Sequence, residues 1–174
     1  MTDSSPEIPA AVHALIGVVQ YPEQSSFAIE MGYVYNTCAA VQNGNPLFWD
    51  EAVAQEITQG WITPPTMMSV WFRPHYWAPG ASGEQKALRT HFDLKELLDL
   101  PEAIISGNEA VFGVPVRPGD RLHTHQIVRS ISEMKDTKVG RGRFWVIDVE
   151  TFNQDDEFVG RETYTCLGYR RSAS

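Results

Sequence analysis

The sequence predicts an α+β fold in which an antiparallel sheet packs around a central apolar helix. Segments with helical character occupy the first half of the 174-residue chain. The last third instead holds β-branched and aromatic runs separated by turn residues, which is typical of consecutive strands. Short turns between consecutive strands favour antiparallel pairing. Helices grouped apart from the strands are characteristic of α+β domains.

The N-terminal part of the chain is predicted to form two helices and a short strand. Residues 1–7 are polar, and we expect them to be disordered. The alanine-rich segment Ala10–Leu15 suits a short helix. Alternating apolar and polar residues predict a short strand at Phe27–Glu30, and a longer helix is expected over Gly32–Val41.

The middle of the chain predicts the central helix. A turn is expected at Gln42–Pro46, because Asn and Gly tolerate positive φ and Pro keeps the preceding residue out of the α region. Asp50–Gln59 is predicted to be helical, with its acidic first turn favoured by the helix dipole. After a break at Thr63–Thr66, the stretch Thr66–Trp77 is apolar on most sides, as expected of a helix surrounded by other structure. Ala78–Glu84 has the composition of a loop.

The C-terminal part predicts the sheet. A short helix is expected at Leu94–Leu98, inside a loop-like region that extends to about Gly107. Four strands are then predicted, over Ala110–Val116, Arg121–Ser132, Arg141–Phe152 and Phe158–Tyr169. No internal repeat or domain boundary is visible, so residues 1–174 are expected to form a single domain.

Composition argues against several classes of partner. Lys and Arg number 14 against 22 Asp and Glu, for a net charge of −8, and a nucleic acid or an anionic membrane would call for clustered cations instead. No apolar run approaches the roughly 18 residues of a membrane span, and no secretory signal is visible. Cys38 and Cys166 make neither a disulfide framework nor a zinc site. We expect a cytoplasmic protein without nucleic-acid, membrane or metal partners.

Four blocks of sequence occur in an order and at a spacing that resemble one family. They are Ala39–Asp50, Gly60–Thr66, Val116–Leu122 and the closing strands with Lys138–Phe152 and Val159–Glu162. Over about residues 20–170 the chain resembles MaoC-like hydratases and dehydratases, nearest to their FAS1-like dehydratase (MaoC N-terminal) subgroup. The resemblance implies the hot-dog fold, an antiparallel sheet wrapped around a central apolar helix, with two such units paired edge to edge.

The resemblance also shows which catalytic groups are missing. Hydration of an enoyl thioester needs a general base, a proton donor and a hydrogen-bond donor for the thioester oxygen. Active relatives supply an Asp and a His five positions apart, and the backbone N–H of a glycine before the central helix. Those positions correspond here to Asn43, Phe48 and Pro65. Neither an amide nor a phenyl ring titrates near neutral pH, and proline has no N–H, so the resemblance implies no catalytic residue in this chain.

Some enzymes of this family are heteromers in which one hot-dog subunit carries the Asp and His while the other shapes the acyl pocket. The resemblance implies that this chain is a subunit of the second kind, in a heterodimer or heterotetramer. The reaction would be that of a hydro-lyase, an enoyl-CoA hydratase or 3-hydroxyacyl thioester dehydratase. Its substrate would carry a bulky acyl group, from a steroid side chain or a long-chain lipid. Coenzyme A would enter only as part of the substrate, and no cofactor is expected.

Two alternatives stay open from the residues alone. One is a homo-oligomeric protein that binds acyl thioesters without catalysis. The other is an active homodimer that uses a pair outside the family pattern, such as His75 with Asp50. His123 and His125 share one face of a predicted strand, but no third metal ligand accompanies them.

An aromatic cluster marks the candidate binding region. Four of the five tryptophans lie between residues 49 and 77. Such a cluster suits a wide apolar pocket, although aromatic side chains serve equally in core and interface packing. The candidate substrate-binding residues are Trp49, Trp61, Ile62, Thr63, Pro64, Trp71 and Arg73. Arg73, with Lys86 and Arg89, is also a candidate to meet the phosphates of coenzyme A.

Overall fold

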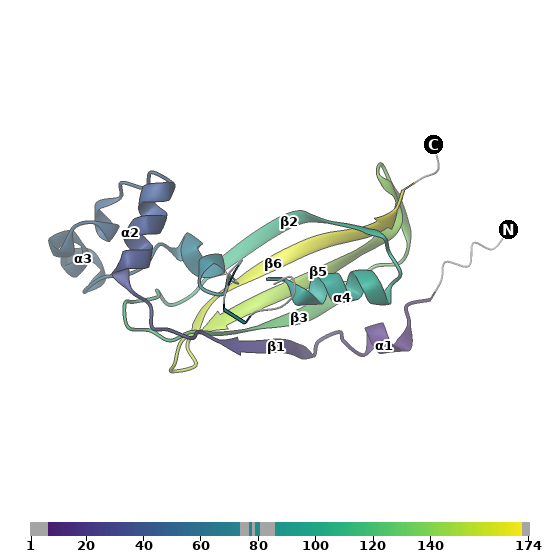
Figure 1. Cartoon of the computed structure of the whole chain (residues 1–174), viewed down its shortest axis with the longest axis horizontal. Helices are drawn as coiled ribbons and strands as arrows, with labels where there is room; N and C mark the ends of the chain where they lie inside the picture. Colours follow the sequence, from purple (N-terminus) through teal and green to yellow (C-terminus); the bar gives the residue numbers. More distant parts are fainter. Residues whose placement is uncertain (1–6, 74–76, 78, 81–85, 172–174) are drawn as a thin grey trace.

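A computed structural model describes residues 7–73, 77, 79–80 and 86–171 of the chain. It contains a six-stranded sheet with the order β1-β3-β5-β6-β2, and β4 pairs with β5 beside this path (Figure 1). Every pair of neighbouring strands is antiparallel. The strands are β1 (Val19–Gln24), β2 (Glu102–Phe112), β3 (His123–Ile131), β4 (Lys135–Thr137), β5 (Gly140–Phe152) and β6 (Phe158–Arg170).

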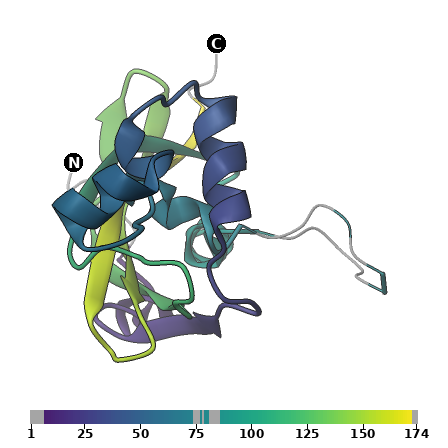
Figure 2. The ribbon, with the colours of Figure 1, turned by 90° about the vertical axis from the view of Figure 1, so that its left-hand side faces the viewer.

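The helices fall into two groups. Near one end of the sheet lie α2 and α3 with the 3-10 helix η1, and Figure 2 shows this group from that end. Helix α4 instead lies along one face of the sheet (Figure 1). The helical segments are α1 (Ala10–His13), α2 (Met31–Ala40), η1 (Pro46–Phe48), α3 (Glu51–Thr58), η2 (Pro65–Val70) and α4 (Arg89–Leu97). This arrangement confirms the α+β prediction.

The apolar segment expected as one helix over Thr66–Trp77 is shorter in the structure. A 3-10 helix spans Pro65–Val70, and a turn follows at residues 71–72. The sequence explains the early end, because Pro74 lacks the N–H that a helix interior needs and disfavours the α conformation at Arg73. The rest of that prediction, residues 74–76, lies outside the described part of the chain. Helix α4, at Arg89–Leu97, is longer than the Leu94–Leu98 helix expected there.

The strand predicted at Phe27–Glu30 is wrong, and the first strand is β1 instead. In the predicted segment, Ile29 bonds to the turn before β3. Its N–H donates to the carbonyl of Asp120 at 2.9 Å, and its carbonyl accepts from the N–H of Gly119 at 2.8 Å. Residues 27–30 are therefore held by a turn and form no ladder with a strand.

β2 differs from its prediction in both start and position. It begins at Glu102, eight residues before the predicted start at Ala110, and it ends at Phe112. It also pairs with β6 at the far edge of the sheet, whereas β3 pairs with β1 and β5. Of the four predicted strands, only those that correspond to β3, β5 and β6 therefore follow one another as neighbours in the sheet. The expected disorder of residues 1–7 and the loop Ala78–Glu84 fall largely outside the described residues.

Two hydrophobic clusters form the core. One lies where α2, η1 and η2 meet the sheet, and the other lies beneath α4, where Trp145 and Ile147 of β5 are fully buried. Cys38 belongs to the first cluster and Cys166 to the second, and both thiols are free. Within the described residues, no helix combines the length and hydrophobicity that a membrane span requires.

Candidate functional site

The loop after α2 is stabilised by its own hydrogen bonds. Gln42 adopts a positive φ of 54°, and the side-chain oxygen of Asn43 accepts the N–H of Asn45 at 3.1 Å. Asn45 caps η1 by accepting the N–H of Leu47 at 3.0 Å. The indole N–H of Trp49 donates to the carbonyl of Asn43 at 2.8 Å. The Asn43 amide therefore helps to hold the loop conformation, at the position where active relatives carry an Asp.

Phe48 belongs to the core of the chain. Its side chain is only 6% exposed and packs in the cluster that includes Cys38, Met67 and Trp71. A phenyl ring at the family's His position can neither accept nor deliver a proton. Asp50, two residues further on, caps α3 by accepting the N–H groups of Ala52 and Val53 at 2.9 and 3.3 Å.

Pro65 begins η2 and has no N–H to offer a thioester oxygen. Two nearby N–H groups, those of Thr63 and Met67, are already engaged. That of Thr63 donates to the carbonyl of Val116 at 2.8 Å, and that of Met67 donates to Pro64 at 2.9 Å. The alternative pair of His75 with Asp50 stays a prediction, because His75 lies outside the described residues.

The candidate substrate-binding residues differ in how exposed their side chains are. Thr63, Pro64 and Trp71 are buried, and Ile62 packs partly buried against the first core cluster. Trp49 is 45% exposed, and Arg73 is exposed at the end of the turn after η2. Contact with a substrate remains a prediction for all of them.

Tyr35 of α2 joins two of these tryptophans and was not among the candidate residues. Its ring stacks on Trp49, with the centroids 5.3 Å apart, and meets Trp61 edge-on at 6.4 Å. On the same helix Tyr33 stacks on Phe27 at 5.5 Å and meets Trp71 edge-on at 6.5 Å. Tyr33 and Tyr35 are two positions apart and so lie on different sides of α2, which means that no helical spacing in the sequence marks them as a pair.

A small pocket lies on the face of the sheet that α4 covers. Its volume is about 70 Å³, and it opens between η2 and the start of α4. Strands β3, β5 and β6 contribute the side chains at its base, and the lining comprises Met68, Ser69, Phe72, Ala87, Leu88, Thr124, Val149, Thr151, Glu162 and Tyr164. Glu162 and Tyr164 were not predicted as site residues, because nothing local to β6 shows which strand positions face η2.

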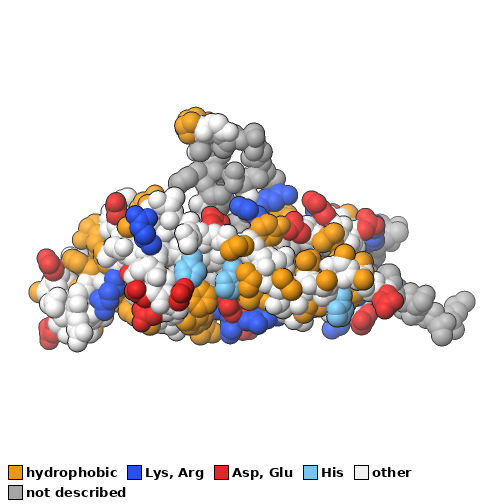
Figure 3. Space-filling view, turned by 90° about the horizontal axis from the view of Figure 1, so that it is seen from below, with side chains coloured by type: hydrophobic (Ala, Val, Ile, Leu, Met, Phe, Trp, Pro, Cys, Tyr) orange, Lys and Arg blue, Asp and Glu red, His pale blue; other side chains and the backbone are white. Residues whose placement is uncertain are grey.

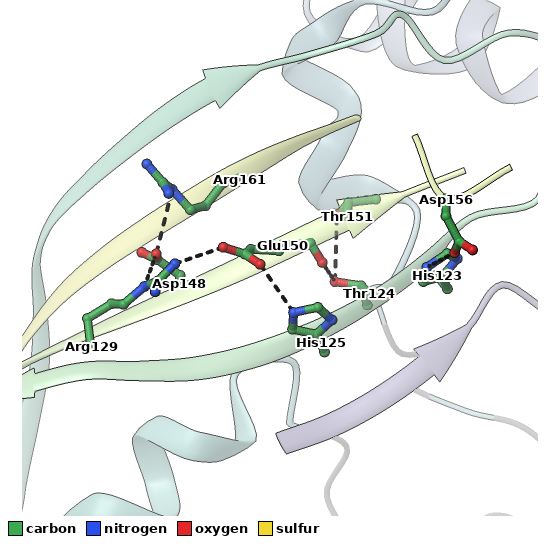
Figure 4. A network of polar contacts seen from close by, with 9 residues as sticks. All are labelled: His123, Thr124, His125, Arg129, Asp148, Glu150, Thr151, Asp156 and Arg161. Atoms are coloured by element: carbon green, nitrogen blue, oxygen red, sulfur yellow. Dashed lines mark hydrogen bonds and ion pairs between the residues drawn. The ribbon is translucent and has the colours of Figure 1, made fainter. Parts of the chain in front are cut away.

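A polar network occupies neighbouring strands (Figure 4). Asp148, 4% exposed, receives the Arg129 Nε–H at 2.5 Å and the Thr163 hydroxyl at 2.7 Å. Arg161 Nε lies 3.6 Å from the same carboxylate. The hydrogen bond with Asp148 is the main cause that raises the pKa of Arg129. This network links side chains of β3, β5 and β6.

The two strand histidines each have a carboxylate partner. His125 Nε2 lies 3.2 Å from Glu150, which Arg129 also contacts at 2.8 Å, and His123 Nε2 lies 3.3 Å from Asp156. Figure 3 shows histidine side chains near the middle of one face, among acidic and hydrophobic ones. In the described part of the chain, no group of three or more His, Cys, Asp or Glu is placed to hold a metal.

The cysteines are poor nucleophiles. Burial raises the pKa of Cys38, and it raises the pKa of Cys166 to about 12. The thiolate is the reactive form of cysteine, so both side chains stay protonated and inert near neutral pH.

The chain has the hot-dog fold, as comparison with solved structures shows. Its TM-score is 0.76 to a chain of the ChsH1-ChsH2 complex from Mycobacterium tuberculosis, at 19% identity over 90% of this chain and 86% of that one. A MaoC-like dehydratase from Rhodospirillum rubrum gives a TM-score of 0.57 at 21% identity, covering 90% of this chain and 95% of that one. A chain of the HadBC (3R-hydroxyacyl-ACP dehydratase) complex from M. tuberculosis gives 0.58 at 19% identity, covering 88% and 97%.

The sequence comparison identifies the family. The family described as "FAS1-like, dehydratase domain region" matches residues 14–162, and the chain belongs to it. A curated relative, the probable enoyl-CoA hydratase alpha subunit of Thermomonospora curvata, is 25% identical over 159 residues. That match covers 86% of this chain but 47% of the relative, so the chain spans about half the length of the relative. The resemblance seen in the sequence is thereby confirmed.

Proposed function

We propose that this chain is the non-catalytic subunit of a cytoplasmic MaoC-like enoyl-CoA hydratase or 3-hydroxyacyl thioester dehydratase. It shapes the acyl pocket, and a sister hot-dog subunit supplies the Asp and His. The observation that carries the proposal is the position of Phe48, which is buried in the core where an active subunit holds its His. With Asn43 holding the loop and Pro65 lacking an N–H, all three family positions lack the group that the chemistry needs.

Relatives with known assemblies support a heteromeric partner. The ChsH1-ChsH2 and HadBC structures are complexes of two different chains, and the T. curvata relative is named an alpha subunit. In such an assembly the sister subunit's Asp and His would activate the water and protonate the α-carbon. This chain would contribute a wall of the acyl site and exclude water from it.

Strand β2 offers the surface for this partner. It lies at the edge of the sheet (Figure 1). It is an 11-residue strand with side chains that are largely exposed. Four of these are large and apolar, with exposures of 42–52%: Ile104, Ile105, Val111 and Phe112. A long apolar edge strand readily pairs with another chain, so pairing with the edge of the sister's sheet would satisfy its backbone and cover this surface.

The way in which helical segments cover the sheet supports the proposal that the substrate carries a bulky acyl group. Two short helical segments, η2 and α4, cover the inner face in place of one long helix, and the pocket lies between them. We propose that the thioester of a steroid side chain or a long-chain lipid binds along this region, against exposed Trp49 and Arg73 and half-buried Trp61.

Purification of the chain from its source cells tests the proposal. Native mass spectrometry is expected to find a second hot-dog chain that carries the Asp and His. The isolated chain is expected to leave trans-2-enoyl-CoA thioesters unhydrated, and the assembled complex to hydrate them. Full activity in the unmixed chain would reject the silent-subunit assignment. Recovery of copies of this chain alone, with thioester binding and no hydration, would favour the homo-oligomeric binding protein.

A further inference from the structure

The pocket between η2 and α4 combines an apolar rim with polar groups at its base. Met68, Phe72, Ala87 and Leu88 contribute apolar surface from the covering segments. The sheet contributes Thr124 and Thr151 from β3 and β5, and Glu162 and Tyr164 from β6. Polar groups placed in a mostly apolar pocket are the usual means by which a binding site fixes the orientation of a ligand.

Glu162 and Tyr164 form a hydrogen-bonded pair on β6. Their positions are two residues apart, so both side chains point to the same face of the sheet. Asn108 of β2 stands opposite Tyr164 in the register, and its amide donates to Glu162 at 3.5 Å. Burial, followed by the charge and hydrogen bonding of Glu162, raises the pKa of Tyr164 to about 12. Tyr164 therefore keeps its proton and stays a hydrogen-bond donor near neutral pH.

The two threonines are also fixed. The Thr124 hydroxyl donates to the carbonyl of Glu150 at 2.7 Å, and the Thr151 hydroxyl donates to the Thr124 oxygen at 3.5 Å (Figure 4). Both protons are thus directed into the protein. The oxygens keep lone pairs that can accept a hydrogen bond.

The volume of the pocket and the charges beside it limit the kinds of ligand that it can bind. A volume of about 70 Å³ has room for one small substituent of a ligand, so an acyl skeleton or a nucleotide would lie outside the pocket and only such a substituent would enter it. The charges near the base oppose each other, because the Glu162 carboxylate raises the pKa of Tyr164 and the positive charge of Arg73 lowers it, so the pocket offers a phosphate or a carboxylate no excess of positive charge. A neutral hydroxyl group fits both limits, because it can donate to Glu162 and accept from Tyr164.

We propose that this pocket binds a hydroxyl substituent carried by the acyl part of the substrate. The ligand hydroxyl inserts between the two side chains: Glu162 accepts its hydrogen, and the Tyr164 O–H turns from Glu162 to donate to its oxygen. The apolar rim contacts the carbon skeleton beside it. This inference rests on the proposed function, since it names a feature of the acyl group that the subunit selects.

The test uses two steroid thioesters that differ by one ring hydroxyl, lithocholoyl-CoA and cholanoyl-CoA. Isothermal titration of the assembled complex is expected to give about tenfold tighter binding of the hydroxylated probe, the effect of one well-made hydrogen bond. Tyr164→Phe and Glu162→Gln are each expected to bring the ratio close to one, because the hydroxylated probe loses the hydrogen bonds that the pair makes to its hydroxyl.

A matched pair of controls lies elsewhere in the chain. Tyr21 of β1 donates to Asp93 of α4, which is a second tyrosine–carboxylate pair outside the pocket. Tyr21→Phe and Asp93→Asn are expected to keep the tenfold preference. Thermal unfolding of each variant shows whether it is folded.

The outcomes separate the two proposals. Equal wild-type affinities in a complex that hydrates enoyl thioesters would overturn the hydroxyl site and leave the hydratase assignment standing. Equal weakening of both probes by the pocket variants would also overturn it, because the pair would then serve only structure. A complex that neither binds the thioesters nor hydrates an enoyl thioester would reject the proposed function, and the hydroxyl site with it.

Discussion

Trp49 donates its indole N–H to the backbone carbonyl of Asn43 at 2.8 Å, which closes the loop between α2 and η1. Stacking of the Trp49 ring on Tyr35 fastens this loop to α2. The loop therefore keeps its shape without the Asp and His. In the silent subunit that we propose, this loop would still present a fixed surface to a substrate and a partner.

Restoring the two family residues is not expected to restore catalysis. In the double variant Asn43→Asp with Phe48→His, the imidazole would enter the apolar core, where burial disfavours its charged form. Pro65 would still offer no N–H to the thioester oxygen. Loss of enoyl absorbance, measured with the isolated variant, should stay at the background rate. Clear turnover would show that the site lacked only these two side chains.

The neighbours Phe48 and Trp49 should differ in their contribution to stability. Phe48→Ala leaves a cavity in the first core cluster and should lower the free energy of unfolding by about 3–5 kcal/mol. Trp49→Ala removes the stacking on Tyr35 and one hydrogen bond at the surface, with an expected loss of about 1–2 kcal/mol. Urea unfolding of both variants compares them directly. Equal losses would contradict the assignment of Phe48 to the core.

His91 should make stability depend on pH. It is 6% exposed in α4, close to Trp145, and burial lowers its pKa, with a smaller effect from Lys95. The folded state thus favours neutral His91, whose contribution is fully present above the unfolded pKa of about 6.5. It is lost as the pH falls below that value toward the folded pKa. The urea midpoint of wild type should therefore fall more between pH 7.5 and pH 5 than that of His91→Phe. An equal fall of the urea midpoint in the two proteins would show that His91 does not cause the pH dependence.

Asp148 and Asp156 should also differ in their contribution to the free energy of unfolding. Asp148→Asn weakens the bonds from Arg129 and Thr163 at a carboxylate that is 4% exposed. Because Arg129 is 44% exposed and reaches water, the expected loss is about 1–3 kcal/mol, below that of a fully buried pair. Asp156 is 88% exposed, and Asp156→Asn should leave the urea midpoint unchanged. A loss of similar size in the two variants would show that the network adds no stability of its own.

The sequence predicted those elements whose signals are local. The cap at Asp50 and the β-branched runs of β3, β5 and β6 place their elements within a few residues of the structure. The position of β2 depends on pairing with β6, about 50 residues away in sequence, and no local pattern shows that. The residues at the base of the pocket could not be predicted from the sequence for the same reason. Glu162 and Tyr164 face it only because β6 lies under η2, whereas Asn43 and Phe48 share one short loop.

A charge on the edge strand should block assembly and leave the fold intact. Val111 of β2 is 48% exposed, so Val111→Lys costs the isolated chain little, because the ammonium group reaches water. Pairing with a second sheet would bring that charge next to apolar side chains at the edge, which disfavours association. Val139→Lys is the matched control, because Val139 is 43% exposed in the turn between β4 and β5, away from this edge. Native mass spectrometry with the sister subunit should show assembly of wild type and Val139→Lys, and loss of assembly for Val111→Lys. Normal assembly of Val111→Lys would place the partner on another surface.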